Sequence, residues 1–261
     1  MEMIKVLGGG EVGSALEEML LDSGYKVFLV DLDFLRYNGK EYKDGSSIPV
    51  GEDLWDFNPK CDILHVCIPF SNSFADNVLA EVDETTELVI IHSTVPVGTT
   101  GEINKRIGRV VCVHSPVRGV HPNLVEGLRT FVKYVGADDE TLFRRAIVHL
   151  ERMGIEIVED GGGSRDTEMA KIMSTTYYGW NIIFEKEMKK LCDREGLDFE
   201  KVYSDWNETY NEGYRKLGMG HVVRPVLEDM PGKIGGHYIT PNCKLIDTFL
   251  TRTILARDET F

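Results

Sequence analysis

The chain has 261 residues, of which 42% are hydrophobic and 28% are charged, as in ordinary globular proteins. Its formal net charge of −14 argues against nucleic acid as a partner, because phosphate backbones are bound by clustered Lys and Arg side chains. No apolar stretch approaches the roughly 18–20 residues that cross a bilayer, and the first residues lack the pattern of a signal peptide. We therefore expect a cytoplasmic protein with no membrane partner.

The cysteine pattern argues against a disulfide framework and against a zinc site. The chain has five cysteines, an odd number, and they include no Cys-x-x-Cys pair. We expect most of them to be buried, reduced thiols. They are Cys61, Cys67, Cys112, Cys192 and Cys243.

The first 160 residues alternate short apolar runs with helix-like stretches. The runs are rich in β-branched residues and nearly continuous in hydrophobicity, as is typical of strands that are covered on both faces. Strand–helix–strand alternation at this spacing predicts an α/β fold with a Rossmann-type, doubly wound parallel sheet. We expect strands at 4–7, 26–30, 63–68, 88–91 and 110–113, and helices at 11–23, 73–84 and 99–107.

The character of the sequence changes after about residue 160. Three glycines at 161–163 precede a long helical pattern, which begins at Ser164 or Asp166 and stops at Gly196. Further helical patterns cover 199–217 and 245–257, and a second glycine-rich turn lies between them at 231–236. The pattern predicts two domains, a Rossmann-type nucleotide domain over 1–160 and a mainly helical domain over 161–261.

The long helical pattern also predicts the environment of its side chains. Its apolar residues recur at steps of three and four, as on the buried face of a helix. We expect Trp180 and the pair Tyr177 and Tyr178 to pack in the core or at a subunit contact. The acidic residues are expected to form the solvated face, and they are Glu185, Glu187, Asp193 and Glu195.

A glycine-rich turn between the first strand and the first helix predicts a dinucleotide site. Gly8 permits the tight turn, Gly10 lets the main chain approach a pyrophosphate, and Gly13 allows close helix–sheet packing. The N–H groups at the start of the helix, around Glu11 and Val12, then face the phosphates.

Asp31 predicts which dinucleotide binds. It ends the second strand, 18 positions after Gly13, where a carboxylate accepts hydrogen bonds from ribose hydroxyls. The same carboxylate repels a 2′-phosphate, so NAD is favoured over NADP. A turn without a ligand, or one that binds S-adenosylmethionine, is the alternative interpretation.

Six segments, taken in order, form a recognisable set. The segment at 93–100, Ser-Thr-Val-Pro-Val-Gly-Thr-Thr, and the second glycine turn at 231–236 are the most specific of them, and the others are those at 8–13, 31–33, 66–69 and 168–171. With these segments the chain resembles the UDP-glucose/GDP-mannose dehydrogenase family. Members of this family bind NAD and oxidise the primary alcohol of a sugar nucleotide to a carboxylate in two hydride transfers.

The resemblance implies further cofactor contacts and an assembly state. Pro69, Ser93 and Thr94 would line the NAD site, with Ser93 and Thr94 on its nicotinamide side. Family members pair through the long middle helix, so the second domain would be a central dimerisation domain and the chain a homodimer. The segment from Tyr177 to Phe184 is consistent with this pairing.

The chain departs from the family pattern at four positions. Tyr238 stands where the family has its nucleophilic cysteine, and Asn242 stands where it has an aspartate. Thr175 replaces an asparagine four residues after Lys171, and Val117 replaces a glutamate. We also expect the chain to lack the further C-terminal domain with which family members help to hold the nucleotide of the substrate.

The loss of the cysteine changes the expected chemistry. Oxidation beyond the aldehyde proceeds through a thiohemiacetal, which requires a thiolate. A single hydride transfer remains possible, and we hypothesise that Lys171 and Tyr238 form its acid–base pair, with Thr175 beside them. A solvated lysine and a packing tyrosine are the alternative, and Cys243 as a displaced nucleophile is a further one.

The segment after the last predicted strand carries candidate substrate ligands. Loops beyond the carboxyl ends of parallel strands face the ligand crevice, so His114, Arg118 and His121 are expected to bind an anionic sugar or sugar nucleotide, together with Asn242. A metal site built from His114, His121 and His237 is not expected, because no carboxylate stands at ligand spacing with them.

Three functions are therefore compared. The first is an NAD-dependent oxidoreductase that interconverts an alcohol and a carbonyl on a sugar, sugar nucleotide or hydroxy acid. The second is a non-catalytic relative that keeps the NAD fold, and the third is an S-adenosylmethionine-dependent transferase.

Overall fold

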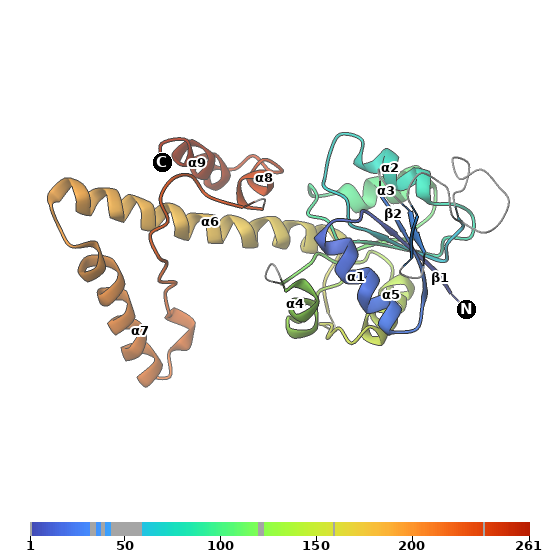
Figure 1. Cartoon of the computed structure of the whole chain (residues 1–261), viewed down its shortest axis with the longest axis horizontal. Coiled ribbons are helices and arrows are strands. Elements are labelled where there is room, and N and C mark those ends of the chain that lie inside the picture. Colours follow the sequence, from blue (N-terminus) through green and yellow to red (C-terminus); the bar gives the residue numbers. More distant parts are fainter. Residues whose placement is uncertain are drawn as a thin grey trace. The chain divides into compact units, whose positions relative to one another are not determined.

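The computed structural model describes residues 2–31, 35–37, 40–42, 59–119, 123–158, 160–236 and 238–261 (Figure 1). The chain divides into two compact units, Met1–Lys171 and Ile172–Phe261. No helix within the described ranges is both long enough and apolar enough to cross a membrane.

The first unit is built on a seven-stranded sheet, counted over the described residues, in the order β4-β3-β2-β1-β5-β6-β7. The five strands from β2 to β7 in this order are parallel, and β3 and β4 add an antiparallel hairpin beyond β2. The Rossmann-type parallel sheet predicted from the sequence is confirmed. The strands are β1 (Met3–Leu7), β2 (Lys26–Val30), β3 (Leu35–Tyr37), β4 (Lys40–Tyr42), β5 (Ile63–Val66), β6 (Leu88–Ile91) and β7 (Cys112–His114).

Helices cover both faces of this sheet (Figure 1). One core cluster joins the strands to α1 (Glu11–Asp22), α4 (Leu124–Thr130) and α5 (Glu140–Arg152). A second cluster joins the opposite strand residues to α2 (Phe74–Glu81) and α3 (Thr99–Ile107). Burial on both faces explains why the strands read as continuous apolar runs.

The outer side of β7 is covered by main-chain and amide groups. Asn104 of α3 accepts hydrogen bonds from the main-chain N–H groups of Val111 and Cys112, at 2.9 and 2.8 Å, and donates to Cys112 O at 3.3 Å. His114 pairs with Gly136 through two main-chain hydrogen bonds of 2.9 and 2.8 Å. The sequence predicted this strand at 110–113, and these pairings extend it to His114 instead.

The second unit is helical. Its elements are most of α6 (Ser164–Glu195), a π-helical turn (Glu200–Asp205), α7 (Trp206–Lys216), a short 3-10 turn (Gly220–Val222), α8 (Ile239–Cys243) and α9 (Phe249–Asp258). Ile239 of α8 and Ile254 of α9 pack where α6 carries Gly179, and a Cβ at this glycine would lie 2.7 Å from the Ile239 side chain. The long helix therefore needs a glycine at this position.

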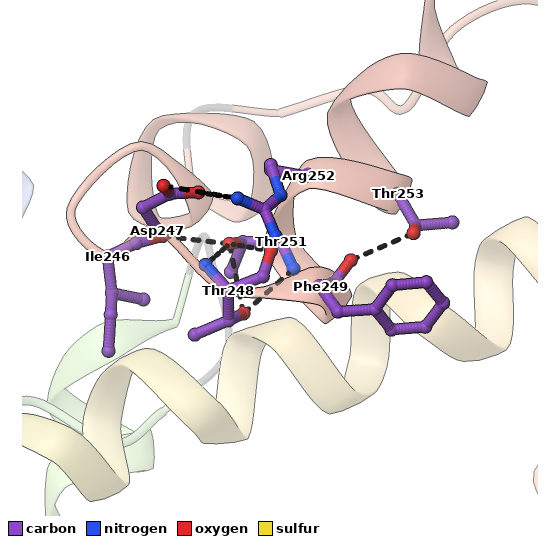
Figure 2. Close-up of polar contacts among 7 residues, drawn as sticks. All are labelled: Ile246, Asp247, Thr248, Phe249, Thr251, Arg252 and Thr253. Atoms are coloured by element: carbon purple, nitrogen blue, oxygen red, sulfur yellow. Dashed lines mark hydrogen bonds and ion pairs between the residues drawn. The ribbon is translucent and has the colours of Figure 1, made fainter.

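The closing helix starts four residues later than the expected 245–257. Thr248 and Thr251 form a reciprocal capping box, in which Thr248 Oγ1 accepts from Thr251 N at 3.1 Å and Thr251 Oγ1 accepts from Thr248 N at 3.0 Å (Figure 2). Arg252 and Asp247 form an ion pair of 3.2 Å across the same turn. The cap sets the first helical residue at Phe249.

Two further expectations differ from the structure. The boundary between the units lies at Lys171, beyond the glycines at 161–163, because Thr167, Glu168 and Lys171 of α6 bond to the first unit. Glu185, expected on the solvated face of α6, is buried instead. Burial, and then the charge of Asp229, raise the pKa of Glu185 to about 7.

Candidate functional site

The turn between β1 and α1 has the geometry that its glycines predict. Gly8 has φ +103°, and a Cβ there would lie 3.0 Å from the main chain of Cys67 and Ile68. A Cβ on Gly13 would lie 1.8 Å from Gly8 O, whereas a Cβ on Gly10 would meet no atom within 4 Å. Two glycines are therefore needed for packing, and the third leaves open space in front of the turn.

This turn lies at the switch point of the sheet. The chain runs outward from β1 to β2 on one side and crosses to β5 on the other, and ligand crevices form outside the carboxyl ends of strands at such a point. Ser93, which follows β6, donates from Oγ to Ile68 O at 2.6 Å. Pro69 is exposed beside it, and Thr94 is partly buried. The expected cofactor residues Gly8, Pro69, Ser93 and Thr94 thus follow neighbouring strand ends.

The start of α1 can receive an anion. Gly10 is its N-cap, so the helix has no capping side chain at the N-cap position. Glu11 is exposed and Val12 is partly buried against the core. N–H groups at a helix start bind phosphate oxygens, and the space in front of Gly10 is open, so the turn fits a pyrophosphate.

Asp31 follows β2 at the edge of the same turn. Its Oδ2 accepts a hydrogen bond from the main-chain N–H of Gly9. The contact fixes the carboxylate beside the glycine turn, where a ribose would lie next to a bound pyrophosphate.

His114 is not exposed to a ligand in this structure. Its ring is fully buried, with Nδ1 2.8 Å from Thr167 Oγ1 and Nε2 3.1 Å from Ser93 O. Burial lowers the pKa of His114 to about 3. Both ring nitrogens hold protein groups together, so the arrangement is that of a structural residue rather than of the expected substrate ligand.

Arg118 and Lys171 lie around the segment that follows β7. Arg118 is exposed, donates to Val132 O at 2.9 Å and has its guanidinium 5.4 Å from the centre of the Tyr134 ring. Lys171 Nζ donates to Val117 O at 2.8 Å. Burial, and then the charge of Arg118, lower the pKa of Lys171. A main-chain carbonyl thus contacts the lysine at the position where the family has a glutamate.

The remaining described candidates lie in the second unit. Tyr238 directly precedes α8 and is 42% exposed. Asn242 donates from Nδ2 to Thr175 Oγ1 at 3.3 Å, so these two predicted residues are in contact. Lys171 and Tyr238 belong to different units, and their pairing stays a prediction.

Cys243 does not have the environment of a nucleophile. Its side chain is 1% exposed, and burial raises the pKa of its thiol. A reactive cysteine has a lowered pKa and contact with solvent. The cysteines at all five positions are free, as expected.

His121 and His237 lie outside the described residues. Among the residues that are described, no group of three His, Cys, Asp or Glu side chains could hold a metal ion.

Two polar arrangements in the first unit were not predicted. Lys133 is buried and donates from Nζ to Ser115 O at 2.6 Å and to Pro116 O at 2.9 Å. Single charged residues carry no sequence signal of burial, because lysine is mostly exposed in proteins.

The second arrangement is a buried chain of three histidines. His65 Nδ1 lies 2.9 Å from His92 Nε2, and His65 Nε2 lies 2.9 Å from His149 Nε2. The two terminal Nδ1 atoms, of His92 and His149, have no hydrogen-bond partner among the described residues. Histidines this far apart in the sequence form no recognisable motif.

The sheet order, the glycine turn at the switch point and the acid after β2 define a Rossmann-type fold. No family model matches the chain. A curated UDP-N-acetyl-D-mannosamine dehydrogenase from Methanocaldococcus jannaschii is 25% identical over 272 residues, which cover 91% of this chain and 59% of that protein. The chain thus spans less than two thirds of the length of this relative.

Solved structures agree in fold. The UDP-D-ManNAc dehydrogenase of Pyrococcus horikoshii superposes with a TM-score of 0.71 at 20% identity, covering 98% of this chain and 68% of that chain. The 3-hydroxyisobutyrate dehydrogenase of Mycobacterium tuberculosis gives a TM-score of 0.69 at 19% identity, covering 100% of this chain and 94% of that chain. The predicted resemblance is confirmed, because the chain is similar to UDP-sugar dehydrogenases in sequence and in fold.

Proposed function

We propose that this chain is an NAD-dependent oxidoreductase that interconverts an alcohol and a carbonyl by a two-electron transfer. The observation that carries the proposal is the open glycine turn at the switch point of the sheet. The curated and structural relatives described above, which are named as dehydrogenases, support the same class.

The residues of the first unit would hold NAD as follows. The main chain at Gly10, Glu11 and Val12 binds the pyrophosphate, and Asp31 accepts hydrogen bonds from the ribose. Bound NAD would supply the acceptor for a hydride. Asp31 favours NAD over NADP, because its carboxylate repels a 2′-phosphate.

Lys171 is the proposed catalytic residue within this unit. Its lowered pKa brings the amine closer to neutrality, so that it can take up the proton of a substrate hydroxyl. Val117 O, at 2.8 Å, orients the amine. Tyr238 as its acid–base partner, with Thr175 and Asn242 nearby, completes the proposal.

The proposed substrate is a sugar, a sugar nucleotide or a hydroxy acid, bound through an anionic group. Arg118 is exposed one residue after the carbonyl that orients Lys171, so it supplies a cation beside the proposed reacting group. The relatives' names include both a UDP-sugar and a hydroxy-acid substrate. Oxidation to the carboxylate is not proposed, because Tyr238 stands at the family's cysteine position and Cys243 is a buried thiol.

Binding and turnover test the proposal separately. Thermal-shift titrations with NAD, NADP and S-adenosylhomocysteine should give a rise in melting temperature with NAD, since a ligand at 100 times its Kd adds about 2.7 kcal/mol. A shift with S-adenosylhomocysteine alone would favour the transferase. NADH formation should then be measured with UDP-sugars and with small hydroxy acids, and NAD binding without turnover on either class would favour the non-catalytic relative.

A matched variant pair checks the role of Asp31. The Asp31→Asn variant removes the charge and should reduce the preference for NAD over NADP at least tenfold. Asp22→Asn, on an exposed side chain at the end of α1, should leave the preference unchanged. An unchanged preference in Asp31→Asn would contradict the assignment.

We propose that the chain forms a homodimer through α6. Tyr177, Tyr178 and Phe184 on this helix are 64%, 51% and 57% exposed, more than large apolar side chains usually are in a monomer. Light scattering during size-exclusion chromatography should give twice the monomer mass, and Phe184→Glu should lower it. A wild-type monomer at micromolar concentration would contradict the proposal.

We also propose that the chain resides in a reducing compartment such as the cytoplasm. Five free cysteines support it, because disulfides form and persist mainly in oxidising compartments. Fractionation of the source cells should recover the chain with cytoplasmic markers.

A further inference from the structure

Main-chain carbonyls at the end of β6 hold the N–H groups of the segment that follows β7, and lysine side chains hold its carbonyl groups. The N–H groups of Ser115 and Val117 donate to Ile91 O and His92 O, at 2.9 and 3.3 Å. The carbonyl groups point to lysines. Ser115 O and Pro116 O accept from Lys133, and Val117 O accepts from Lys171.

Two lysine side chains therefore bind three consecutive carbonyl oxygens. The distances from Lys133 Nζ are 2.6 and 2.9 Å, and the distance from Lys171 Nζ is 2.8 Å. Ser115 and Pro116 are buried, and so are their contacts with Lys133, so their carbonyls would be without water if they lost this lysine. A buried polar group without a partner costs roughly 1–3 kcal/mol.

We propose that Lys133 is a positioning residue for Lys171. By holding the carbonyls of Ser115 and Pro116, its side chain sets the path of the main chain so that the next carbonyl, that of Val117, faces the Lys171 amine. The inference rests on the proposed function, in which Lys171 contacts the substrate.

The burial of Lys133 supports this role. Its side chain is 1% exposed, and no carboxylate of the described residues forms an ion pair with it. A buried, unpaired ammonium is costly, so a lysine that served only to fill space would be replaced by an apolar residue at lower cost. Burial, and then the charge of Lys171, lower the pKa of Lys133 to about 7. A neutral amine still has two N–H donors for its two carbonyls.

Other titratable groups surround Lys133 on several elements. They are His65 on β5, Cys67 after β5, His92 after β6, His114 on β7 and Lys171 on α6. All but Lys171 are neutral near pH 7, because burial lowers the pKa of the histidines and raises that of the thiol. Among these groups, Lys171 is the one whose charge lowers the pKa of Lys133, while Arg118 is the charge that lowers the pKa of Lys171.

The test measures the reactivity of each lysine in the full chain without NAD or substrate. Limiting acetic anhydride is applied across pH 6–11, and mass spectrometry gives the plateau reactivity and the midpoint for every lysine. In Lys133→Met, the carbonyls of Ser115 and Pro116 lose their donor, so the Lys171 amine should become more exposed. Its plateau reactivity should rise at least threefold, and the midpoint of its titration should move toward the value of a free lysine. Other lysines should keep their profiles.

Two controls separate positioning from a general loss of structure. Lys105→Met, on an exposed residue of α3, should leave the Lys171 profile unchanged. Lys133→Gln keeps one donor group and should give an intermediate Lys171 profile, and it replaces the Met variant if that variant does not fold. An unchanged Lys171 profile in a folded Lys133 variant would overturn the proposal, as would equal changes at every lysine.

The reactivity profile of Lys171 can be measured whether or not the proposed reaction occurs. If the Lys171 profile changes but the wild-type chain shows no NAD-linked turnover, the proposed function fails while the contact between the two lysines stands. If turnover occurs and the Lys171 profile does not change, the positioning role of Lys133 fails alone.

Discussion

Glu168 on α6 caps the N-terminus of α3 through Thr100. Glu168 Oε1 accepts from Thr100 N at 2.8 Å and from Thr100 Oγ1 at 2.7 Å, and Oε2 accepts from Gly98 N at 2.5 Å. The N-cap residue of this helix is Gly98, which has no side chain that could cap it. Two segments that resemble the dehydrogenase family, 93–100 and 168–171, are thus joined by one buried carboxylate.

The Glu168→Gln variant should lose about 1–3 kcal/mol of unfolding free energy, because the amide places a donor against a main-chain N–H. Urea denaturation measures the loss. Glu102→Gln, on an exposed residue in the first turn of the same helix, is the control and should change stability by less than about 0.5 kcal/mol. Equal stabilities of the two variants would rule out the capping role.

Alanine substitutions at two glycines of the first turn should separate an effect on folding from an effect on NAD binding. Gly13→Ala places a Cβ 1.8 Å from Gly8 O and should destabilise the first unit by about 3 kcal/mol or more. Gly10→Ala meets no atom within 4 Å, at a φ of −68° that alanine adopts freely.

The Gly10 variant should therefore keep its melting temperature while its affinity for NAD falls at least tenfold, because the new methyl group occupies the space in front of the turn. Calorimetric titration with NAD gives the affinity. Wild-type affinity in Gly10→Ala would show that no pyrophosphate lies there.

The buried histidines should make stability depend on pH in the acid range. Burial lowers the pKa of His65 and His92 well below 6.5, and that of His149 to about 4. The unfolded chain therefore binds more protons than the folded chain between about pH 6.5 and 4. The free energy of unfolding should therefore be level with respect to these histidines above pH 6.5. Below that pH it should fall by up to about 1.4 kcal/mol per pH unit for each histidine.

Urea unfolding at pH 7.5, 6 and 5 measures this dependence. His149→Phe, which removes one end of the chain of rings, should flatten it, while His221→Ala, on an exposed side chain, should not. A wild-type stability that stays level from pH 7.5 to 5 would mean that the histidines are not buried as neutral rings.

The acid–base hypothesis predicts similar losses of kcat when either of two residues is replaced. Lys171→Met and Tyr238→Phe should each lower kcat at least a hundredfold, because each removes a proton-transfer group. NAD affinity should stay unchanged in both variants. Turnover in Tyr238→Phe equal to that of the wild type would remove Tyr238 from the mechanism and leave Lys171 as the acid–base group.

The parallel sheet and the glycine turn were predictable because both arise from local patterns. Continuous apolar runs mark buried parallel strands, and the spacing of Gly8, Gly10 and Gly13 follows from how closely a helix packs on a strand. The helix at 11–23 agrees with α1 to within one residue, since Ser23 is its C-cap.

Features that depend on distant contacts were not predictable. The burial of Glu185 and Lys133 is decided by what packs on them, and single charged residues carry no periodic signal. The histidine chain joins β5, the end of β6 and α5, which only the fold brings together. The burial of His114 was not predictable for the same reason, because its place in the sequence does not reveal whether the ring points inward.

The side chain of Asn104 has a consequence beyond the packing of α3. β7 is the last strand of its side of the sheet, and strands in that place invite pairing with another polypeptide. The Asn104 amide engages Cys112 on the outer edge, and Gly136 engages His114. An incoming strand finds these main-chain groups already taken, so the amide protects the chain against edge-to-edge aggregation.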